Sequence, residues 1–183
     1  MVDTPVAEGD VSGSIADKAT AFRQLADEHL DASYRLASAI LRDPIEAQDA
    51  VHDAFVTAWR RWDTLRDPAR FPWWFRRIVV NTCRDRLRCI TRHPAAVLPD
   101  EPRIVGEDTT AMVDDHATLD RAFAVLSAED KIVLILRYFL DLSTDDIAQL
   151  TDIAPGTVGS RLNRARGRLH ESLITSQHAE AIS

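Results

Sequence analysis

The sequence predicts an all-α protein of two small helical domains joined by a flexible acidic linker. Residues 20–92 and 117–175 place apolar side chains at the three- and four-residue spacing of amphipathic helices. Residues 93–116 hold three prolines, a glycine and an acidic excess, which disfavours a packed element. No paired strands or internal repeats are evident. We expect residues 1–19 and 176–183 to be terminal tails.

Composition excludes several classes of protein. The chain has 183 residues, is 45% hydrophobic and carries a formal net charge of −7, so it can form packed cores. No run approaches the roughly 18 apolar residues of a membrane helix, and the N-terminus lacks a secretory pattern. We expect a cytoplasmic protein without membrane insertion. Cys83 and Cys89 lack further ligands nearby in the sequence, which favours free thiols over a disulfide or metal clip.

The charges are unevenly distributed along the chain. Residues 20–92 contain 13 arginines and 10 acidic residues, whereas residues 93–127 contain 2 arginines and 7 acidic residues. The first 19 residues are also acidic. A basic face can therefore exist on a protein whose overall charge is negative.

The segment RDPIEAQDAVHDAFVTAWRRW predicts an amphipathic helix that starts near Pro44. Asp49, His52 and Asp53 fall largely on its polar faces. Their spacing permits a solvated surface, or an acid–base or metal site, but no second cluster of ligands supports the latter. The apolar stripe consists of Val51, Ala54, Phe55, Ala58, Trp59 and Trp62.

The segment FPWWFRRIVVNTCRDRLR predicts a second helix with a cationic face. Arginine neutralises phosphates, asparagine can pair with a base edge, and tryptophan can stack on an unpaired base. Such a face suits single-stranded nucleic acid, although an exposed arginine face with a packed Trp73 is equally compatible with the spacing. The face comprises Trp73, Arg77, Asn81, Arg84 and Arg88, whereas Phe75, Ile78, Val79 and Thr82 can point inward.

The segment STDDIAQLTDIAPGTVGSRLNRARGRL predicts a helix-turn-helix. Ser143 is a suitable N-cap, and Pro155 can open the second helix. A plain helical hairpin is the alternative. We expect an upstream buried stripe of Ile132, Ile135, Leu136, Phe139 and Leu140, a core seam of Val158, Leu162, Ala165 and Leu169, and a DNA-facing flank of Thr157, Ser160, Arg161, Arg164 and Arg168.

These three motifs, in this order, resemble the extracytoplasmic-function (ECF) sigma factors of the bacterial sigma-70 family over most of the chain. The resemblance implies that residues 20–92 form sigma region 2 and residues 117–175 form sigma region 4. It implies an RNA polymerase sigma factor that binds core polymerase through its beta and beta-prime subunits, and that directs promoter recognition, melting and initiation. It also implies an anti-sigma factor as a partner.

The resemblance further implies roles for individual residues. The first helix would bind core polymerase, the second would read the melted minus-ten element, and the helix-turn-helix would read the minus-thirty-five element. The acidic linker would thread toward the active-site channel of polymerase. The resemblance implies polymerase contacts at Asp49, His52, Asp53, Phe55 and Trp59, minus-ten contacts at Trp74, Arg77 and Asn81, and minus-thirty-five contacts at Ser160 and Arg161. The shared helix faces add Trp73, Arg84 and Arg88 to the expected minus-ten contacts, and Thr157, Arg164 and Arg168 to the expected minus-thirty-five contacts.

The chain departs from the family pattern at a few positions. His52 stands where glutamine is commoner, while Trp73 and Arg76 replace residues that are usually smaller or aromatic. Val80 and Gly159 replace frequent basic residues, so we expect weaker phosphate contacts there. These differences bear on the promoter sequence rather than on the class of protein.

Two rival functions explain parts of the pattern. A stand-alone helix-turn-helix regulator would bind duplex DNA as a dimer, but it leaves the helix at 46–62 and the stripe at 73–88 unexplained. A metal hydrolase using His52 and nearby carboxylates would need stoichiometric metal. The sequence shows no nucleophile–base pair, phosphate-binding loop or metal cluster, so we predict no catalytic residues and no cofactor.

Overall fold

The computed structural model describes residues 9–92 and 118–180, with side chains for residues 17–92 and 118–175. The regular elements within these ranges are all helical, which confirms the predicted fold class. The expected linker at 93–116 lies outside the described residues.

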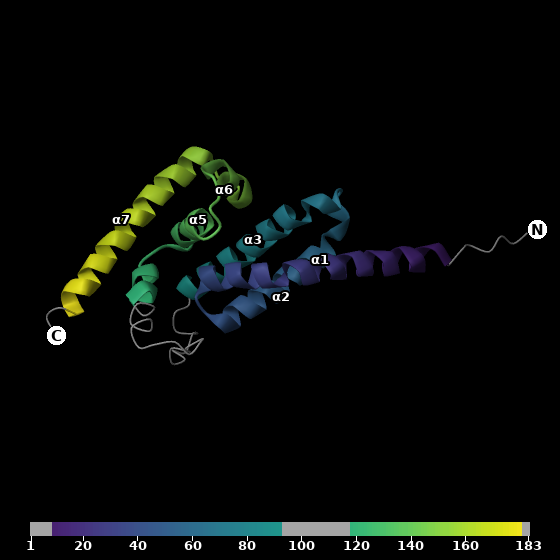
Figure 1. Cartoon of the computed structure of the whole chain (residues 1–183), viewed down its shortest axis with the longest axis horizontal. Coiled ribbons are helices and arrows are strands. Elements are labelled where there is room, and N and C mark those ends of the chain that lie inside the picture. The colour runs from purple at the N-terminus through teal and green to yellow at the C-terminus, as the bar shows by residue number, and fades with distance from the viewer. Residues whose placement is uncertain (1–8, 93–117, 181–183) are drawn as a thin grey trace, which may run out of the picture.

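Three helices form the first domain (Figure 1): α1 (Gly9–Leu41), α2 (Pro44–Arg60) and α3 (Phe71–Arg92). Two short 3₁₀ turns, η1 (Trp62–Thr64) and η2 (Pro68–Arg70), connect α2 to α3. Each helix packs against the other two. The buried core includes Leu36, Ala37 and Ile40 of α1, Val51 and Ala54 of α2, and Phe71, Phe75, Ile78, Val79, Cys83 and Leu87 of α3.

A sharp connection joins α1 to α2. Arg42 has a left-handed backbone (φ 56°), and the carboxylate of Asp43 accepts hydrogen bonds from the backbone N–H groups of Ile45 and Glu46. Pro44 opens α2, where a missing N–H group costs nothing. A capping side chain of this kind stabilises a helix by roughly 1 kcal/mol.

The buried face of α2 is formed largely by alanines. Ala47, Ala50, Ala54 and Ala58 are all fully buried. Because alanine is small, this face lets α1 and α3 approach α2 closely, while the opposite side of the helix keeps its polar residues in solvent. Ala47 and Ala50 were not part of the predicted stripe.

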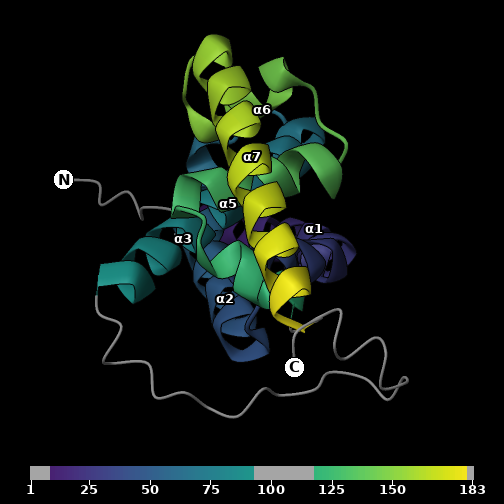
Figure 2. The ribbon, with the colours of Figure 1, turned by 90° about the vertical axis from the view of Figure 1, so that its left-hand side faces the viewer.

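The second domain contains a helical segment at 118–124, then α5 (Ala128–Tyr138), α6 (Thr144–Thr151) and α7 (Pro155–Glu180). In the side view of Figure 2, α7 passes over α5, and the two helices are in contact. Val158 and Ala165 of α7 are fully buried, as the predicted seam requires.

The turn between α6 and α7 has the expected helix-turn-helix form. Ser143 caps α6 and forms a capping box with Asp146. Asp152 ends α6 in a left-handed conformation (φ 60°), and Pro155 opens α7. Aspartate tolerates this backbone region better than most residues.

Three local expectations were wrong. Residues 9–19 belong to α1 rather than to a loose tail, and residues 176–180 extend α7. Phe139, expected in the buried stripe, is half exposed because α5 ends at Tyr138, one residue before it. At residues 9–19 and at residues 176–180, a helix that is already packed continues outward, so no new helix has to be nucleated.

The two domains pack against each other. Helix α3 contacts both α5 and α6, and α1 contacts α5. A single buried cluster includes Val80 and Leu87 of α3 together with Ile132 of α5 and Ile147 of α6. The domains therefore share an apolar interface, which the idea of two bodies on a flexible tether did not predict.

Candidate nucleic-acid interface

The predicted cationic face of α3 lies beside the junction between the domains. On its inner side, the helix is anchored in the core by Phe71 and Phe75, whose stacked ring centroids lie 5.3 Å apart. This anchoring fixes which side of α3 is turned outward. Arg77 and Arg88 are exposed there, while Trp73, Trp74, Asn81 and Arg84 are half-buried.

A cleft of about 750 Å³ opens at the start of α3. Two aromatic rings beside several guanidinium groups can stack on an unpaired base and neutralise its phosphates. Arg66 and Arg70 were missed by sequence reasoning because the 3₁₀ segments have no helical periodicity. The lining residues are Thr64, Leu65, Arg66, Asp67, Arg70, Trp73, Trp74 and Arg77, with Asp146 and Gln149 of α6.

Asn81 and Arg84 act as a pair. The Arg84 guanidinium donates a 2.7 Å hydrogen bond to the Asn81 side-chain oxygen, and a longer one of 3.4 Å to the backbone carbonyl of Thr151 in α6. Burial, reinforced by the nearby charge of Arg88, lowers the pKa of Arg84. This arginine is therefore held in place and partly desolvated.

Acidic residues of the second domain pair with Arg77 and Arg88, the two exposed arginines of the predicted face. The guanidinium of Arg77 lies 3.6 Å from the Asp152 carboxylate, and that of Arg88 lies 2.6 Å from the Glu129 carboxylate. Burial alone would raise the pKa of Glu129, but the hydrogen bond from Arg88, a backbone hydrogen bond and the charges of Arg88 and Arg161 together outweigh it, and the pKa is lowered. In this arrangement, carboxylates of the second domain neutralise the two exposed arginines of the predicted face.

The predicted flank of α7 is only partly open to solvent. Thr157, Ser160 and Arg164 are exposed. The Ser160 hydroxyl donates to the backbone carbonyl of Thr157, and the Arg164 guanidinium reaches the carbonyl of Ser160. These three residues can meet a DNA groove without rearrangement.

Arg161 and Arg168 are held by their surroundings. Arg161 is half-buried, and within the described residues its Nε has no hydrogen-bond partner. It lies close enough to Arg84 and Glu129 to influence the pKa of each. Arg168 donates a 3.0 Å hydrogen bond to Asp130, a buried carboxylate on α5. Arg168 thus contributes to holding α7 against α5.

Three of the residues expected to bind polymerase form an exposed patch on α2. Asp49, His52 and Asp53 all face solvent, as their predicted positions on the polar side require. The two aromatic residues behave differently. Phe55 packs between Phe22 and Phe75, with its ring 4.4 Å from that of Phe75. Phe55 therefore packs on the inner side of α2 and does not belong to the exposed surface of the patch.

The other aromatic residue, Trp59, remains 38% exposed although α1 covers part of it. The Phe22 ring meets it edge-on at 5.2 Å, and the Lys18 ammonium lies 5.3 Å from its ring centroid while also pairing with Asp63. The early turns of α1 therefore hold Trp59 in place at the end of the patch.

An arginine that the predicted stripe omitted contacts the acidic side of α2. Arg86 of α3 donates 2.6 Å hydrogen bonds to both Glu46 and Asp53, and its guanidinium lies 3.9 Å from Asp49. The carboxylates considered for an acid–base or metal site are thus engaged by an arginine. Over residues 9–92 and 118–180, no group of three or more histidine, cysteine or acidic side chains is arranged around a possible metal position.

Four other positions discussed in the sequence analysis are Val80, Cys83, Cys89 and Gly159. Val80 is fully buried in the cluster that the two domains share. Cys83 and Cys89 are free thiols, as predicted, the former buried and the latter exposed. Gly159 lies within α7, and a Cβ atom added there would meet nothing within 4 Å.

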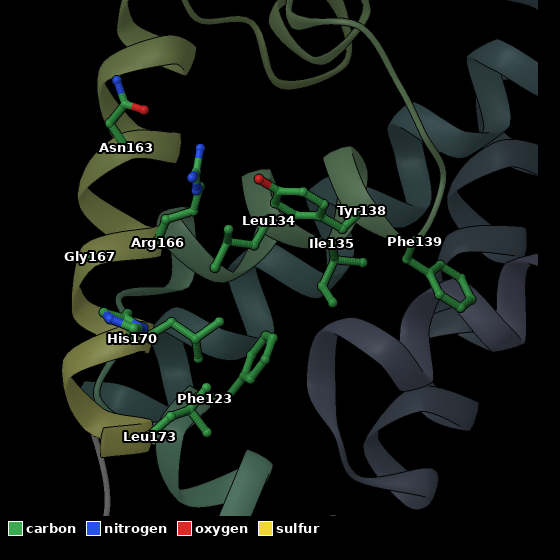
Figure 3. Close-up of a pocket in the computed structure, with 11 residues that line it drawn as sticks. Phe123, Leu134, Ile135, Tyr138, Phe139, Asn163, Arg166, Gly167, His170 and Leu173 are labelled. Carbon is green, nitrogen blue, oxygen red and sulfur yellow. The ribbon is translucent and has the colours of Figure 1, made fainter. Parts of the chain in front are cut away.

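An apolar groove of about 880 Å³ lies on a different face of α7 from the predicted DNA flank (Figure 3). Phe123, Tyr138 and Phe139 provide aromatic walls, and Arg166 and His170 of α7 form a basic edge. Tyr138 is 63% exposed. The sequence pattern did not predict this groove because its residues come from three separate helices.

Two family models match the chain in the order of its two domains. Residues 25–93 match the model of sigma-70 region 2, and residues 116–169 match that of sigma-70 region 4. The RNA polymerase sigma-E factor of Streptomyces coelicolor is 32% identical over 155 residues, covering 84% of this chain and 86% of the relative. The chain belongs to the ECF branch of the sigma-70 family.

Other ECF relatives and solved structures agree with this assignment. The ECF sigma factor SigM of Mycobacterium tuberculosis is 36% identical over 159 residues, covering 87% of this chain and 80% of the relative. RpoE of Bartonella quintana, solved with the anti-sigma factor NepR, has a TM-score of 0.63 at 26% identity and covers 83% of this chain and 96% of that one. CnrH, solved with the cytosolic domain of CnrY, has a TM-score of 0.60 at 25% identity, covering 86% and 95%.

As an ECF sigma factor, the chain places its two family regions on the two packed domains. Region 2 carries the α2 patch and the α3 face, and region 4 carries α6 and α7. No helix in the parts of the chain that the structure describes is long and apolar enough to cross a membrane.

Proposed function

We propose that this chain acts as an RNA polymerase sigma factor that directs core polymerase to the promoters of a specific regulon. The observation that carries the proposal is the presence of both sigma-70 regions, in order, on one chain whose helices display two separate cationic surfaces. The chain binds and positions DNA and polymerase and performs no catalysis itself. It would act in the cytoplasm, together with polymerase.

The minus-ten element is read by region 2 in this proposal. Asn81 and Arg84, joined by a hydrogen bond, would meet the upstream edge of the melted bubble, and the cleft beside Trp73 and Trp74 would receive an unpaired base. Base stacking on an aromatic side chain contributes roughly 1–3 kcal/mol per base. Arg77 and Arg88 would hold the backbone phosphates at this edge.

The minus-thirty-five element is read by α7. Exposed Thr157 and Ser160 lie near the start of the recognition helix, and Arg164 follows one turn later. The N-terminal residues of such a helix are those that reach base edges in a major groove. Arg161 and Arg168 would join them by leaving their present positions near Glu129 and on Asp130.

Polymerase binding is assigned to the exposed patch of Asp49, His52, Asp53 and Trp59, with Phe55 supporting it. The beta-prime and beta subunits of core polymerase are the partners. We also propose an anti-sigma factor, because the similar RpoE was solved in complex with one, NepR, and the similar CnrH was solved with the cytosolic domain of another protein, CnrY.

The two DNA surfaces can be tested separately. In complex with core polymerase, Asn81→Ala should lower binding to a template with a single-stranded minus-ten element by about ten-fold, since stacking and base contacts of roughly 1–3 kcal/mol are at stake. Arg164→Ala should weaken binding to duplex minus-thirty-five DNA and reduce the magnitude of the salt slope by about 0.9.

Arg23→Ala, at an exposed position on α1, is the matched control for the loss of one positive charge. Arg23→Ala should leave binding to both templates unchanged. If it weakens binding to duplex minus-thirty-five DNA as much as Arg164→Ala does, the loss comes from overall charge and the assignment of the surface on α7 is wrong.

A further inference from the structure

The guanidinium of Arg86 lies beneath the acidic patch of α2. Glu46, Asp49 and Asp53 share one side of the helix, at spacings of three and four residues. Their side chains are 36%, 62% and 55% exposed, whereas that of Arg86 is 24% exposed. The carboxylates thus keep contact with solvent while the arginine that joins them lies underneath.

Arg86 belongs to a different face of α3 from the DNA-facing arginines. It is two residues from Arg84 and two from Arg88, which places it about 200° around the helix from each. One guanidinium nitrogen donates to Glu46 and the other to Asp53, each at 2.6 Å. Both ends of the planar group are therefore committed to α2, which leaves it poorly placed to bind a phosphate.

The arrangement has an electrostatic consequence for the patch. Three carboxylates and one guanidinium leave a formal charge of −2, so the patch stays acidic and suits a basic partner surface. Without the guanidinium, carboxylates at these helical spacings would repel one another and would move independently. A group fixed before binding loses less entropy when its partner arrives.

We propose that Arg86 is a positioning residue for polymerase binding, which orients the Asp53 carboxylate toward a basic surface of core polymerase. The inference rests on the proposed role of the α2 patch. It separates the arginines of α3 into a group that meets DNA and one that prepares the polymerase contact.

Arg86→Gln distinguishes positioning from simple attraction. It makes the patch more negative, so attraction alone predicts tighter binding to a basic partner, whereas loss of positioning predicts weaker binding. The full chain, with a fluorophore at its N-terminus, is titrated with core polymerase and followed by anisotropy. We expect about ten-fold weaker binding, within the range of coupling between contacting side chains. Arg60→Gln, an equal charge change at an exposed site on α2, should bind as wild type or more tightly.

A double-mutant cycle separates positioning from a general structural role. If Arg86 acts through Asp53, the variant carrying both Arg86→Gln and Asp53→Asn should bind core polymerase no more weakly than Asp53→Asn alone. The proposal is overturned if the loss of affinity in the double variant equals the product of the two single losses. It is also overturned if Arg86→Gln binds core polymerase within two-fold of wild type. Either result leaves the polymerase patch intact. Should Asp53→Asn itself have no effect, both the patch and the positioning role fail.

Two further measurements guard against misfolding and DNA effects. Arg86→Lys keeps the charge but lacks the planar guanidinium whose two nitrogens donate to Glu46 and Asp53 in one fixed geometry. It should therefore fold, as judged by circular dichroism, and still bind core polymerase more weakly. At saturating polymerase, the Arg86→Gln holoenzyme should bind a template with a single-stranded minus-ten element within two-fold of wild type. A larger loss would assign Arg86 to DNA and overturn the inference.

Discussion

Arginines on α3 and α7 have different surroundings, and these set what each can do. Arg77 and Arg88 pair with carboxylates near the surface, where solvent weakens the attraction and the pairs can exchange for phosphates. Arg168 is bound to Asp130, a buried carboxylate, and removing Arg168 would leave that charge buried without a partner, which is costly. Arg77 and Arg88 are therefore easier to release to DNA than Arg168.

The two cysteines should differ sharply in reactivity. Burial raises the pKa of the Cys83 thiol to about 12, so almost no thiolate forms at neutral pH, whereas Cys89 is exposed. A disulfide-exchange reagent should titrate one thiol per native chain at pH 7, and two after denaturation. Cys89→Ser should abolish the fast reaction. Rapid labelling of both thiols in the native protein would contradict the buried position of Cys83.

Helical spacing predicted which side chains share a face, but not what those side chains contact. The stripe of Arg77, Asn81 and Arg84 was found from residues three and four apart, a purely local pattern. Its partners Asp152 and Thr151 are distant in the sequence. Arg86 was left out of the stripe because it lies on another face of α3, and local spacing could not reveal its carboxylate partners on α2.

Among the elements, α7 contains the clearest mismatch between local preference and structure. Gly159 lies inside this helix, where glycine costs up to about 1 kcal/mol relative to alanine. Neither a neighbouring side chain nor a positive backbone angle requires glycine there. The helix forms because Val158 and Ala165 are fully buried against the rest of the domain.

Gly159→Ala should therefore stabilise the protein by about 0.5–1 kcal/mol. The gain should appear as a higher denaturant midpoint with an unchanged slope, measured by circular dichroism in urea. Gly167→Ala, another position in α7 where an added Cβ meets nothing within 4 Å, provides the comparison. A destabilised Gly159→Ala protein would mean that α7 is not helical at this position.

Most helices and three of their starts could be predicted, while the start of α1 and the end of α7 could not. Pro44, Ser143 and Pro155 mark helix starts through local chemistry, and each stands at the expected boundary. The early turns of α1 carry no such signal. Tertiary contacts farther along the helix, such as Phe22 against Trp59 and His29 stacked on Phe71, hold the middle of α1, and a local pattern does not reveal them.

At the scale of the whole molecule, apolar contact dominates the interface between the domains. Fully burying a side chain such as Ile132 contributes roughly 1.5–3 kcal/mol, whereas a surface ion pair such as Arg88–Glu129 contributes about 0–1 kcal/mol. The burial of Ile132 was predicted, but neither its place in the cluster shared by the domains nor the ion pair could be predicted, because the residues involved come from separate domains.

The Glu129 ion pair should make a small, pH-dependent contribution to stability. Its pKa is lower in the folded chain than the ordinary 4.5, so the contribution is present above about pH 4.5 and is lost as the pH falls through the folded value. In urea titrations, Glu129→Gln should be less stable than wild type by at most about 1 kcal/mol at neutral pH. This difference should vanish in acid.

Glu171→Gln, at an exposed position on α7, is the control and should show no such convergence. A difference between Glu129→Gln and wild type that stays constant with pH would show that the carboxylate charge is not what matters.

The central claim is that this chain gives core polymerase its promoter specificity, and run-off transcription tests it most directly. Purified bacterial core polymerase is supplied with a genomic promoter library, with and without the protein. The account predicts discrete transcripts that appear only when the protein is present, from templates sharing two sequence elements at a fixed spacing. If nothing initiates, and the protein binds duplex DNA as a dimer without binding core polymerase, the account is contradicted and a stand-alone DNA-binding regulator takes its place.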